Sequence, residues 1–355
     1  MIQILSPADG GRNRGRCPLA PDAPVPQWAR EHLHCQRPWG APEMNERGTP
    51  IMAIRVLVTD GMDASAMEQL RKDGFEVVEQ FYEPDQLGAA LKDFDAVIIR
   101  SATKIKKQQI DDAKGGKLKL IIRAGVGMDN IDIPYAEAAG IACKNTPRAS
   151  SNAVAELAIS LLFSCARSIS IAGHTMRENK WEKKAYSKGF EVSGKTVGII
   201  GYGRIGRMVG DKCQALGAKV LSVVHRTKPE GCECETMHFV SMDELLSQSD
   251  IVILCAPGGD KAIVDAEALA KMKDGVVIIN VSRGSNVDEA ALLEGLNSGK
   301  VKAAGLDVWM SEKEPNWALA QHPAVSCTPH IGAGTKEAQK RIGAELVDIV
   351  EHFAF

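Results

Sequence analysis

Short apolar runs alternate with longer amphipathic stretches from residue 54 to the end of the chain. Each run is rich in Val and Ile at consecutive positions, which is typical of strands buried between two layers of helices. The sequence therefore predicts an α/β protein with two doubly wound parallel sheets. The first set of runs is 54–60, 75–81, 95–101, 118–125 and a weaker 141–145, and the second is 196–203, 218–224, 250–257, 275–282 and 303–309.

Two longer stretches have the spacing of amphipathic helices. Residues 150–167 place Val154, Leu161 and Cys165 at helical intervals, and the serines at the start suit an N-cap. Residues 337–353 follow the last strand of the second set and are also helical in pattern. This last helix could return to pack on the first domain, but periodicity alone leaves that return open.

Composition narrows the class of protein. A chain of 355 residues with 45% hydrophobic and 25% charged residues has room for two soluble globular domains. The net charge of −2 gives no basic field for nucleic acid. No apolar run approaches the roughly 20 residues that span a bilayer. Nine cysteines without a repeated Cys-x-x-Cys favour reduced thiols in the cytoplasm.

Residues 1–51 differ from the rest of the chain. They contain eight of the 16 prolines and no strand-like run, so they cannot bury enough surface to fold alone. We interpret them as a disordered extension. A targeting segment is the alternative, but acidic residues interrupt the basic ones.

A glycine motif follows the first run of the second set. Gly201, Gly203 and Gly206 stand between a predicted strand and a predicted helix that begins at Arg204 and Ile205. In such a motif the first glycine permits a tight turn, the second lets the backbone approach a pyrophosphate, and the third allows helix and strand to pack closely. The motif predicts a dinucleotide site.

The residues after the next strand bear on the choice of cofactor. An acidic side chain expected there would bind the ribose 2′-hydroxyl of NAD, but the sequence reads Val224-His225-Arg226. A basic pair could instead bind the 2′-phosphate of NADP. We therefore favour NADP slightly over NAD, with two solvated side chains as the plain alternative.

Reduction of a ketone by hydride needs an acid/base with a pKa near neutrality and a cation that orients the substrate. His330 follows an apolar stretch and fits the first need. Arg283 leaves a buried-looking strand and fits the second, because its guanidinium binds a carboxylate through two hydrogen bonds. Glu312 and Glu314 are both candidates to hold the imidazole.

The sequence resembles the D-isomer-specific 2-hydroxyacid dehydrogenase family over about residues 54–355. The matching motifs occur in order: RSATKI (100–105), RAGVGMDNID (123–132), NTPRASSNAVAE (145–156), GYGRIGR (201–207), SRG (282–284), LDVW (306–309) and TPHIG (328–332). Within the family, the motifs are most similar to the phosphoglycerate dehydrogenases, in a short form without a regulatory C-terminal domain.

The resemblance implies a catalytic set of Arg283, Glu312 and His330. Glu312 has the family's spacing, although Glu314 is the residue before Pro315, so Glu312 is preferred. Further roles follow from the matched positions. Asp307 should bind the nicotinamide carboxamide, Ala256 and Val281 should line the cofactor site, the backbone of Val126 and Gly127 should bind the substrate carboxylate, and Arg100, Ser101 and Lys104 should contact the distal end of the substrate, phosphate included.

The resemblance also implies the organisation of the chain. A flavodoxin-like substrate domain of residues 52–149 and 330–355 should carry an inserted Rossmann domain of residues 150–329, and the chain should form a homodimer through the long helix and nearby loops. The expected reaction is oxidation of 3-phosphoglycerate at C2, the entry step of serine synthesis. The alternatives are a reductase of hydroxypyruvate, glyoxylate or another 2-keto acid, and a dinucleotide-sensing corepressor.

Cys232, Cys234 and His238 are the candidates for a metal site. Their spacing is not that of an ordinary zinc site, and no second pair follows. We therefore expect a surface loop here and no metal.

Overall fold

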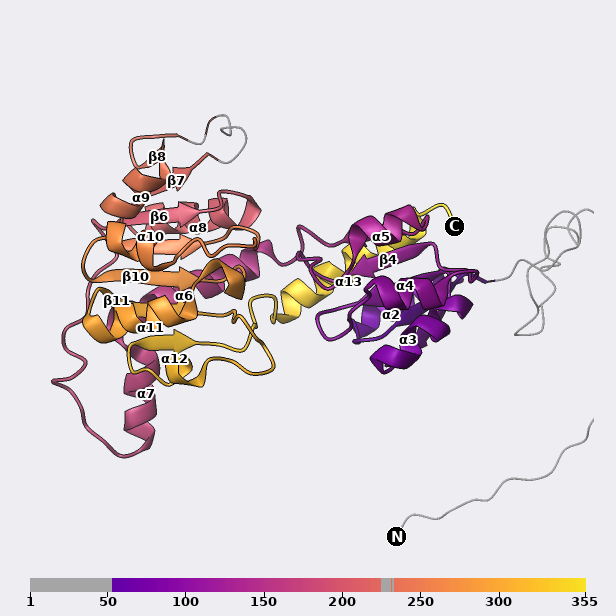
Figure 1. Cartoon of the computed structure of the whole chain (residues 1–355), viewed down its shortest axis with the longest axis horizontal. Helices are drawn as coiled ribbons and strands as arrows, with labels where there is room; N and C mark the ends of the chain where they lie inside the picture. Colours follow the sequence, from indigo (N-terminus) through magenta and orange to yellow (C-terminus); the bar gives the residue numbers. More distant parts are fainter. Residues whose placement is uncertain (1–52, 225–230, 232) are drawn as a thin grey trace, which may run out of the picture. The chain divides into compact units, whose positions relative to one another are not determined.

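The computed structural model describes residues 53–224, 231 and 233–355. The predictions for residues 1–51 and for His225, Arg226 and Cys232 lie outside the described residues. The described chain forms one parallel sheet of five strands and one of seven (Figure 1). The prediction of two doubly wound parallel sheets is therefore confirmed.

The five-stranded sheet has the order β2-β1-β3-β4-β5, and each pair of neighbours is parallel. This is the flavodoxin-like order, whose direction reverses between β1 and β3. Ligands of such sheets bind outside the carboxyl ends of the strands at this switch point. The elements are β1 (Arg55–Val58), α2 (Ala64–Lys72), β2 (Glu76–Glu79), α3 (Pro84–Ala90), the 3-10 turn η1 (Leu91–Asp93), β3 (Ala96–Ile99), α4 (Lys107–Ala113), β4 (Leu120–Arg123), α5 (Ile133–Ala138) and β5 (Ala142–Asn145).

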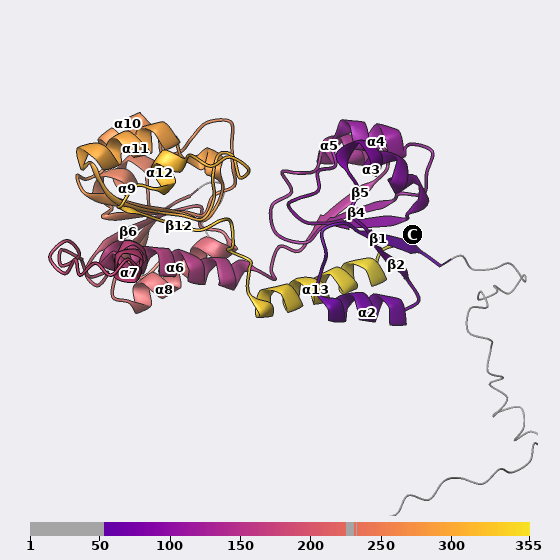
Figure 2. The ribbon, with the colours of Figure 1, turned by 90° about the horizontal axis from the view of Figure 1, so that it is seen from below.

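The last helix of the chain, α13 (Lys336–Glu351), returns to this first sheet. It lies beside α2 on the face opposite α3, α4 and α5 (Figure 2). Ile342, Leu346 and Val350 of α13 share a buried cluster with Val56 and Leu70. The packing that periodicity left open is thus a contact of apolar side chains on both helices.

The seven-stranded sheet has the order β12-β11-β10-β9-β6-β7-β8, with every pairing parallel. Numbered from β6, this is the Rossmann order 3-2-1-4-5-6 with one strand added at the edge. Helices α9 to α12 cover one face, and α6 and α8 cover the other (Figure 2). The strands are β6 (Thr196–Ile200), β7 (Lys219–Val223), β8 (Met237–Val240), β9 (Ile251–Leu254), β10 (Val276–Asn280), β11 (Val301–Leu306) and β12 (Val325–Cys327). The helices are α6 (Ser151–Arg167), α7 (Ile169–Arg177), α8 (Arg204–Ala215), α9 (Met242–Gln248), α10 (Ala266–Lys271), η2 (Gly284–Asn286), α11 (Glu289–Ser298) and α12 (Trp317–Ala320).

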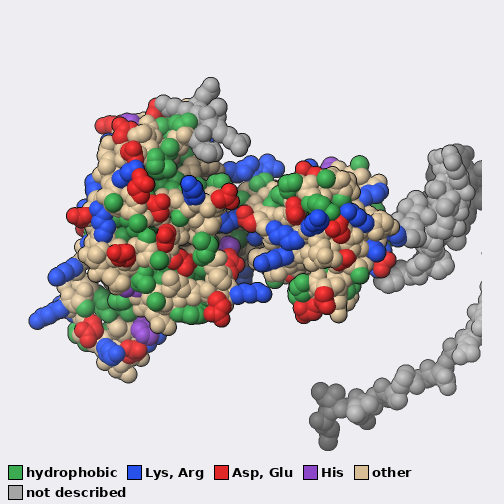
Figure 3. Space-filling model, viewed as in Figure 1, with side chains coloured by type: hydrophobic (Ala, Val, Ile, Leu, Met, Phe, Trp, Pro, Cys, Tyr) green, Lys and Arg blue, Asp and Glu red, His purple; other side chains and the backbone are tan. Residues whose placement is uncertain are grey.

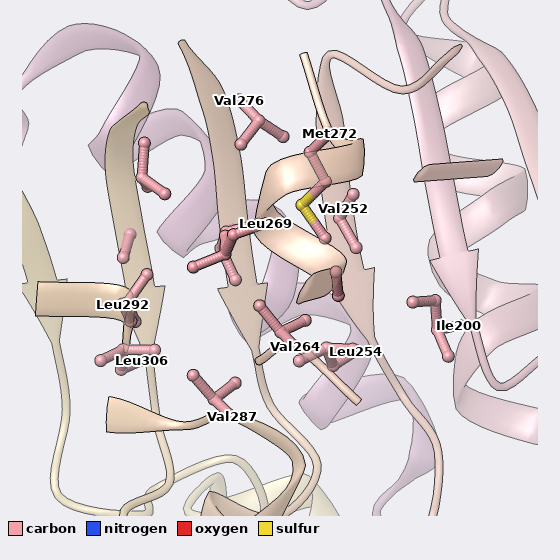
Figure 4. Close-up of a cluster of buried hydrophobic side chains, with 14 of the residues drawn as sticks. Ile200, Val252, Leu254, Val264, Leu269, Met272, Val276, Val287, Leu292 and Leu306 are labelled. Carbon is pink, nitrogen blue, oxygen red and sulfur yellow. The ribbon is translucent and has the colours of Figure 1, made fainter. Parts of the chain in front are cut away.

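Both faces of this sheet are buried, which explains the continuous Val/Ile runs. On one face, Val252 and Leu254 of β9 belong to one buried cluster with Leu269 of α10 and Leu292 of α11 (Figure 4). The alternate residues of the same strands, such as Ile253, join a second cluster with α6 and α8. Successive strand side chains point to opposite faces, so a strand covered on both sides is apolar throughout.

Sequence patterns missed two strands and one capping detail. β8 lies at the sheet edge, where only Met237 is fully buried, and β12 has three residues, so neither contains a long apolar run. Ser150 is the N-cap residue of α6, as the serines at the start of the helix suggested, but its side chain makes no capping hydrogen bond.

Helices α6 and α7 meet at Ser168, whose φ of 54° is left-handed. Among the described residues, no single helix is long and apolar enough to cross a membrane; α6 and α7 meet that test only as a pair bent by 67°.

Candidate functional site

A cavity of about 530 Å³ is lined by the loops at the carboxyl ends of both sets of strands. Most of the residues predicted for the site are in its wall, whereas Lys104, Glu312, Gly201 and Gly206 are not. The predicted residues that line it are Arg100, Ser101, Val126, Gly127, Gly203, Arg204, Ile205, Ala256, Val281, Arg283, Asp307 and His330.

The glycine motif joins β6 to α8 with little space around two of its glycines. Gly201 has a φ of +100°, and a Cβ there would lie 2.4 Å from the Ala256 nitrogen. A Cβ on Gly206 would lie 2.1 Å from the Gly201 oxygen. Gly203, the N-cap of α8, has no atom within 4 Å of such a Cβ. The turn therefore offers open space beside a helix N-terminus, where an anionic pyrophosphate fits.

His330 lies in the loop after β12 and pairs with a carboxylate from the loop after β11. Its Nδ1 atom is 2.5 Å from Oε1 of Glu312. Glu314, the alternative candidate, has its backbone N–H bonded to Ser311, and no contact joins its side chain to His330 in the described chain. Because Nδ1 is occupied, the imidazole can exchange a proton with a substrate only through Nε2.

Asp307 holds the turn that presents His330. Its carboxylate accepts hydrogen bonds from the Thr328 hydroxyl at 2.6 Å and from the backbone N–H groups of Ile331 and Gly332 at 2.8 and 3.0 Å. His330 itself has a left-handed φ of 54°, and its N–H donates to the Asp307 carbonyl. Burial raises the pKa of the Asp307 carboxyl, although hydrogen bonds from Thr328 and Ile331 oppose that shift. In the structure, Asp307 therefore fixes the turn of His330. Its binding of the nicotinamide carboxamide stays a prediction.

Arg283 leaves β10 and reaches a carboxylate that the sequence did not single out. Its Nε donates to Oδ2 of Asp129 at 2.8 Å, and NH1 donates to the Ser282 carbonyl at 2.6 Å. A Cβ on Gly127 would lie 1.5 Å from NH2 of Arg283. Glycine at 127 is thus required for the guanidinium to lie against the backbone that is predicted to bind the substrate carboxylate.

A buried chain of amide and hydroxyl groups supports the turn of Arg283. Asn286 donates to the Ala256 carbonyl at 3.0 Å and to the Ser282 hydroxyl at 2.9 Å. Ser282 in turn donates to Asn280, whose amide donates to the Arg283 carbonyl at 2.8 Å. These bonds join the loop after β9 to the loop after β10. The backbone of Ala256, which is predicted to line the cofactor site, is therefore held to the turn that carries Arg283.

Arg123, at the end of β4, is a cavity residue that sequence reasoning missed. Its Nε atom is enclosed without a hydrogen-bond partner, and NH1 makes one bond, at 3.3 Å, to the Ala124 carbonyl. Burial lowers the pKa of Arg123, and the nearby charges of Arg283 and Arg100 lower it further. Arg123 begins the matched motif of residues 123–132, in which the resemblance gave roles only to Val126 and Gly127.

The loop after β4 presents backbone groups that suit a carboxylate. The side chain of Asn145 donates to the Val126 carbonyl at 2.6 Å and so fixes the peptide. Within residues 53–224 and 233–355, no hydrogen bond uses the N–H groups of Val126 and Gly127. Two free N–H groups beside Arg283 can bind an anionic group.

The predicted cofactor discriminator is only partly described. Val224, after β7, is exposed and apolar where an acidic residue was expected. Cys234 accepts a hydrogen bond from Gln214, and no cluster of three or more His, Cys, Asp or Glu suited to a metal occurs in the described part of the chain. On the face drawn in Figure 3, acidic and basic side chains are interspersed, in keeping with the small net charge.

Comparison with known proteins gives concordant matches. The family model "D-isomer specific 2-hydroxyacid dehydrogenase, NAD binding domain" matches residues 159–332. A hydroxypyruvate reductase of Thermotoga maritima is 44% identical over 300 residues, which are 83% of this chain and 96% of the relative. A D-3-phosphoglycerate dehydrogenase of Archaeoglobus fulgidus is 38% identical over 305 residues, 85% of this chain but only 57% of that longer relative. The crystal structure of a glyoxylate reductase from Paecilomyes thermophila has a TM-score of 0.78 at 31% identity and covers 85% of this chain and 95% of its own.

Proposed function

The chain belongs to the D-isomer-specific 2-hydroxyacid dehydrogenase family, and we propose that its substrate is D-3-phosphoglycerate, which it oxidises to 3-phosphohydroxypyruvate. The membership makes it an oxidoreductase that uses a nicotinamide dinucleotide. The proposal that the substrate is phosphorylated goes beyond family membership. It is supported above all by the charges of the cavity, which contains more cationic side chains than its own carboxylates neutralise.

Four arginines line this cavity, Arg100, Arg123 and Arg283 together with Arg204 of the glycine motif. Only Arg283 forms an ion pair in the described chain, with Asp129. Buried charges without partners are costly, so a site that keeps them is suited to a ligand that supplies the opposite charge. Phosphoglycerate has a carboxylate and a phosphate, whereas glyoxylate and hydroxypyruvate have a carboxylate alone. The surplus of cations therefore favours the phosphorylated acid.

The side chains divide the remaining work of the reaction. The dinucleotide, when bound in the open space at Gly203, supplies the acceptor or donor of the hydride. In the oxidation, Nε2 of His330 takes the proton of the C2 hydroxyl, and Glu312 on Nδ1 stabilises the imidazolium that results. Arg283 orients the carboxylate and the developing carbonyl group.

The reductase reading has its own support. The relative from Thermotoga maritima that matches along 96% of its length is a hydroxypyruvate reductase, and the glyoxylate reductase structure shares the fold. In that case Arg283 and the peptide of Val126 would bind the single carboxylate, and Arg100 and Arg123 would face solvent or small anions.

The cofactor proposal is NADP in slight preference to NAD. It rests on Val224, because an aliphatic side chain cannot accept a hydrogen bond from the ribose 2′-hydroxyl, and it does not repel a 2′-phosphate. His225 and Arg226, which were expected to pair with that phosphate, lie outside the described residues.

We also propose a homodimer that works in serine biosynthesis in the cytoplasm. Helix α7 has no buried residue in the described chain, and three large apolar side chains, Ile169, Met176 and Trp181, are more than half exposed. Apolar side chains exposed together are typical of interfaces. Light scattering on the purified protein should give twice the mass of 38.2 kDa, and a monomer at micromolar concentration would contradict the dimer.

Steady-state kinetics in the direction of reduction tests the substrate. The protein is assayed with 3-phosphohydroxypyruvate, hydroxypyruvate and glyoxylate, each with NADH and with NADPH. We expect kcat/KM to be highest for 3-phosphohydroxypyruvate. Equal or better use of hydroxypyruvate would replace the phosphoglycerate proposal by the reductase reading, and a lack of turnover with retained dinucleotide binding would favour a sensing role.

A further inference from the structure

The loop of residues 100–103 is fixed by two side chains from other loops. It follows β3 and presents Arg100 and Ser101 to the cavity. It also lies at the switch point of the five-stranded sheet, where β1 and β3 are neighbours. Asp60, in the loop after β1, does not itself line the cavity.

Asp60 binds the hydrogen-bond donors of this loop. Its Oδ2 atom accepts the backbone N–H groups of Arg100 at 2.7 Å and of Thr103 at 3.1 Å. Its Oδ1 atom accepts the Thr103 hydroxyl at 2.6 Å. Hydrogen bonds to an ionised acceptor are stronger than those between neutral groups, so one carboxylate holds both ends of the loop.

Asn130 binds the acceptors of the same loop. Its amide donates to the Arg100 carbonyl at 2.6 Å and to the Thr103 carbonyl at 2.7 Å. All four backbone polar groups of Arg100 and Thr103 are therefore engaged by just two side chains. Asn130 directly follows residues 125–129, the loop that is predicted to bind the substrate carboxylate. It therefore connects that loop to residues 100–103, which are predicted to contact the distal end of the substrate.

We infer that Asp60 is a positioning residue for the distal anion of the substrate, which acts by fixing the loop that presents Arg100 and Ser101. The inference rests on the proposed function, because it assigns the phosphate end of the substrate to this loop. A loop that is ordered before binding loses less conformational entropy when the ligand arrives. Asp60 thus contributes to affinity for the phosphorylated acid without touching it.

The test compares Asp60→Asn with Asp95→Asn. Asparagine at 60 removes the negative charge: its one oxygen can still accept both backbone N–H groups while its NH₂ group donates to the Thr103 hydroxyl, but the bonds to the loop are then no longer charge-assisted. Asp95 is the matched control, because it accepts the Arg55 N–H at 2.9 Å at the opposite, amino end of the same sheet. Thr103→Val, which removes the hydroxyl contacts with Asp60 and Thr59 but keeps both backbone N–H bonds to Asp60, is a milder variant should Asp60→Asn fail to fold.

We expect Asp60→Asn to raise KM for 3-phosphohydroxypyruvate roughly tenfold, the effect of replacing charge-assisted hydrogen bonds to the loop by neutral ones, with kcat nearly unchanged. KM for hydroxypyruvate should change much less, because that substrate has no phosphate. Thr103→Val should act in the same direction, and Asp95→Asn should alter neither KM. Equal losses for both substrates in Asp60→Asn would show a general structural role and overturn the inference.

Amide hydrogen exchange in residues 100–103 provides a readout that needs no substrate. Exchange at Arg100 and Thr103 should be faster in Asp60→Asn than in the wild type and in Asp95→Asn. Unchanged exchange at these two residues would overturn the inference that Asp60 fixes the loop, whichever substrate the protein prefers. If the wild-type protein does not prefer the phosphorylated acid, the proposed function is overturned instead. The difference in exchange between Asp60→Asn and the wild type would still decide whether Asp60 fixes the loop.

Discussion

Replacing Arg123 with methionine separates the contribution of this arginine to binding from its contribution to folding. Methionine has a similar length and is apolar, so the variant removes the guanidinium and leaves most of the packing volume. Among the described residues the Nε atom has no hydrogen-bond partner, and the one bond from NH1 is a long one to the Ala124 carbonyl. The charge therefore gains little from the protein itself.

The two effects of Arg123→Met should have opposite signs. A charge-assisted hydrogen bond is worth about 1.5–3 kcal/mol, so the loss of one to phosphate should raise KM for 3-phosphohydroxypyruvate about 10- to 100-fold. The lowered pKa of Arg123 means that the folded state disfavours its charged form, mainly through burial. Removing that charge should leave the melting temperature unchanged or raise it.

Initial rates with 3-phosphohydroxypyruvate and hydroxypyruvate, together with thermal unfolding, measure both effects. Arg71→Met is the control, because Arg71 is an exposed arginine that pairs with Glu79, and neither residue lines the cavity. The reasoning is refuted if Arg123→Met leaves the ratio of the two KM values at the wild-type level. It is also refuted if the variant is destabilised by several kcal/mol, since the guanidinium would then have a structural partner.

Three further predictions concern the rest of the site. Glu312→Ala should lower kcat at least about tenfold and Glu314→Ala should leave kcat near the wild-type value, because Glu312 is the one of the two that contacts His330. Initial rates that fall more in Glu314→Ala would show that Glu314 is the partner of His330 instead. Val224→Asp should shift the ratio of kcat/KM with NADH to kcat/KM with NADPH at least about tenfold towards NADH, because the new carboxylate accepts a hydrogen bond from the ribose 2′-hydroxyl and repels a 2′-phosphate. An unchanged ratio would show that other residues discriminate between the two cofactors. Burial raises the pKa of Cys165 and Cys213 to about 12, so at pH 8 only about one thiol in ten thousand is ionised at these sites. Site-resolved alkylation of the native protein should therefore modify exposed Cys234, whose pKa is lowered by hydrogen bonds from Thr236, well before those two, and labelling of Cys213 at a similar rate would contradict its burial.

The sequence was sufficient for the sheets because their strands are buried on both faces. Such strands are apolar at every position, and this pattern survives without knowledge of the neighbours. It fails where a strand is short or lies at an edge, as with β8 and β12. The return of α13 to α2 could not be derived either, because an amphipathic helix shows that it has a buried face but not which surface covers it.

Site residues were recognised when a motif or a strand end marked them. Arg283 and His330 met that condition, and the cavity contains both. Arg123 lies in the matched motif of residues 123–132 but was given no role there, and Asp60 and Asp129 are carboxylates that by sequence look like any solvated loop residue. Their roles depend on partners 40 or more residues away, Arg100 for Asp60 and Arg283 for Asp129, which only the folded sheet brings near.

The strand order explains how the predicted catalytic set comes together. Arg283 follows β10, Glu312 follows β11 and His330 follows β12, and these three strands are successive neighbours in the sheet. Neighbouring parallel strands lie about 4.8 Å apart, so residues that leave their carboxyl ends arrive within one side chain's reach of each other. A Cβ on Gly284 would lie 2.0 Å from the Trp309 carbonyl carbon, which means that the Arg283 turn is packed directly against the backbone leading to Glu312. Because Asp307 of that same backbone bonds the His330 turn on its other side, a displacement of the segment after β11 would move the arginine and the imidazole together.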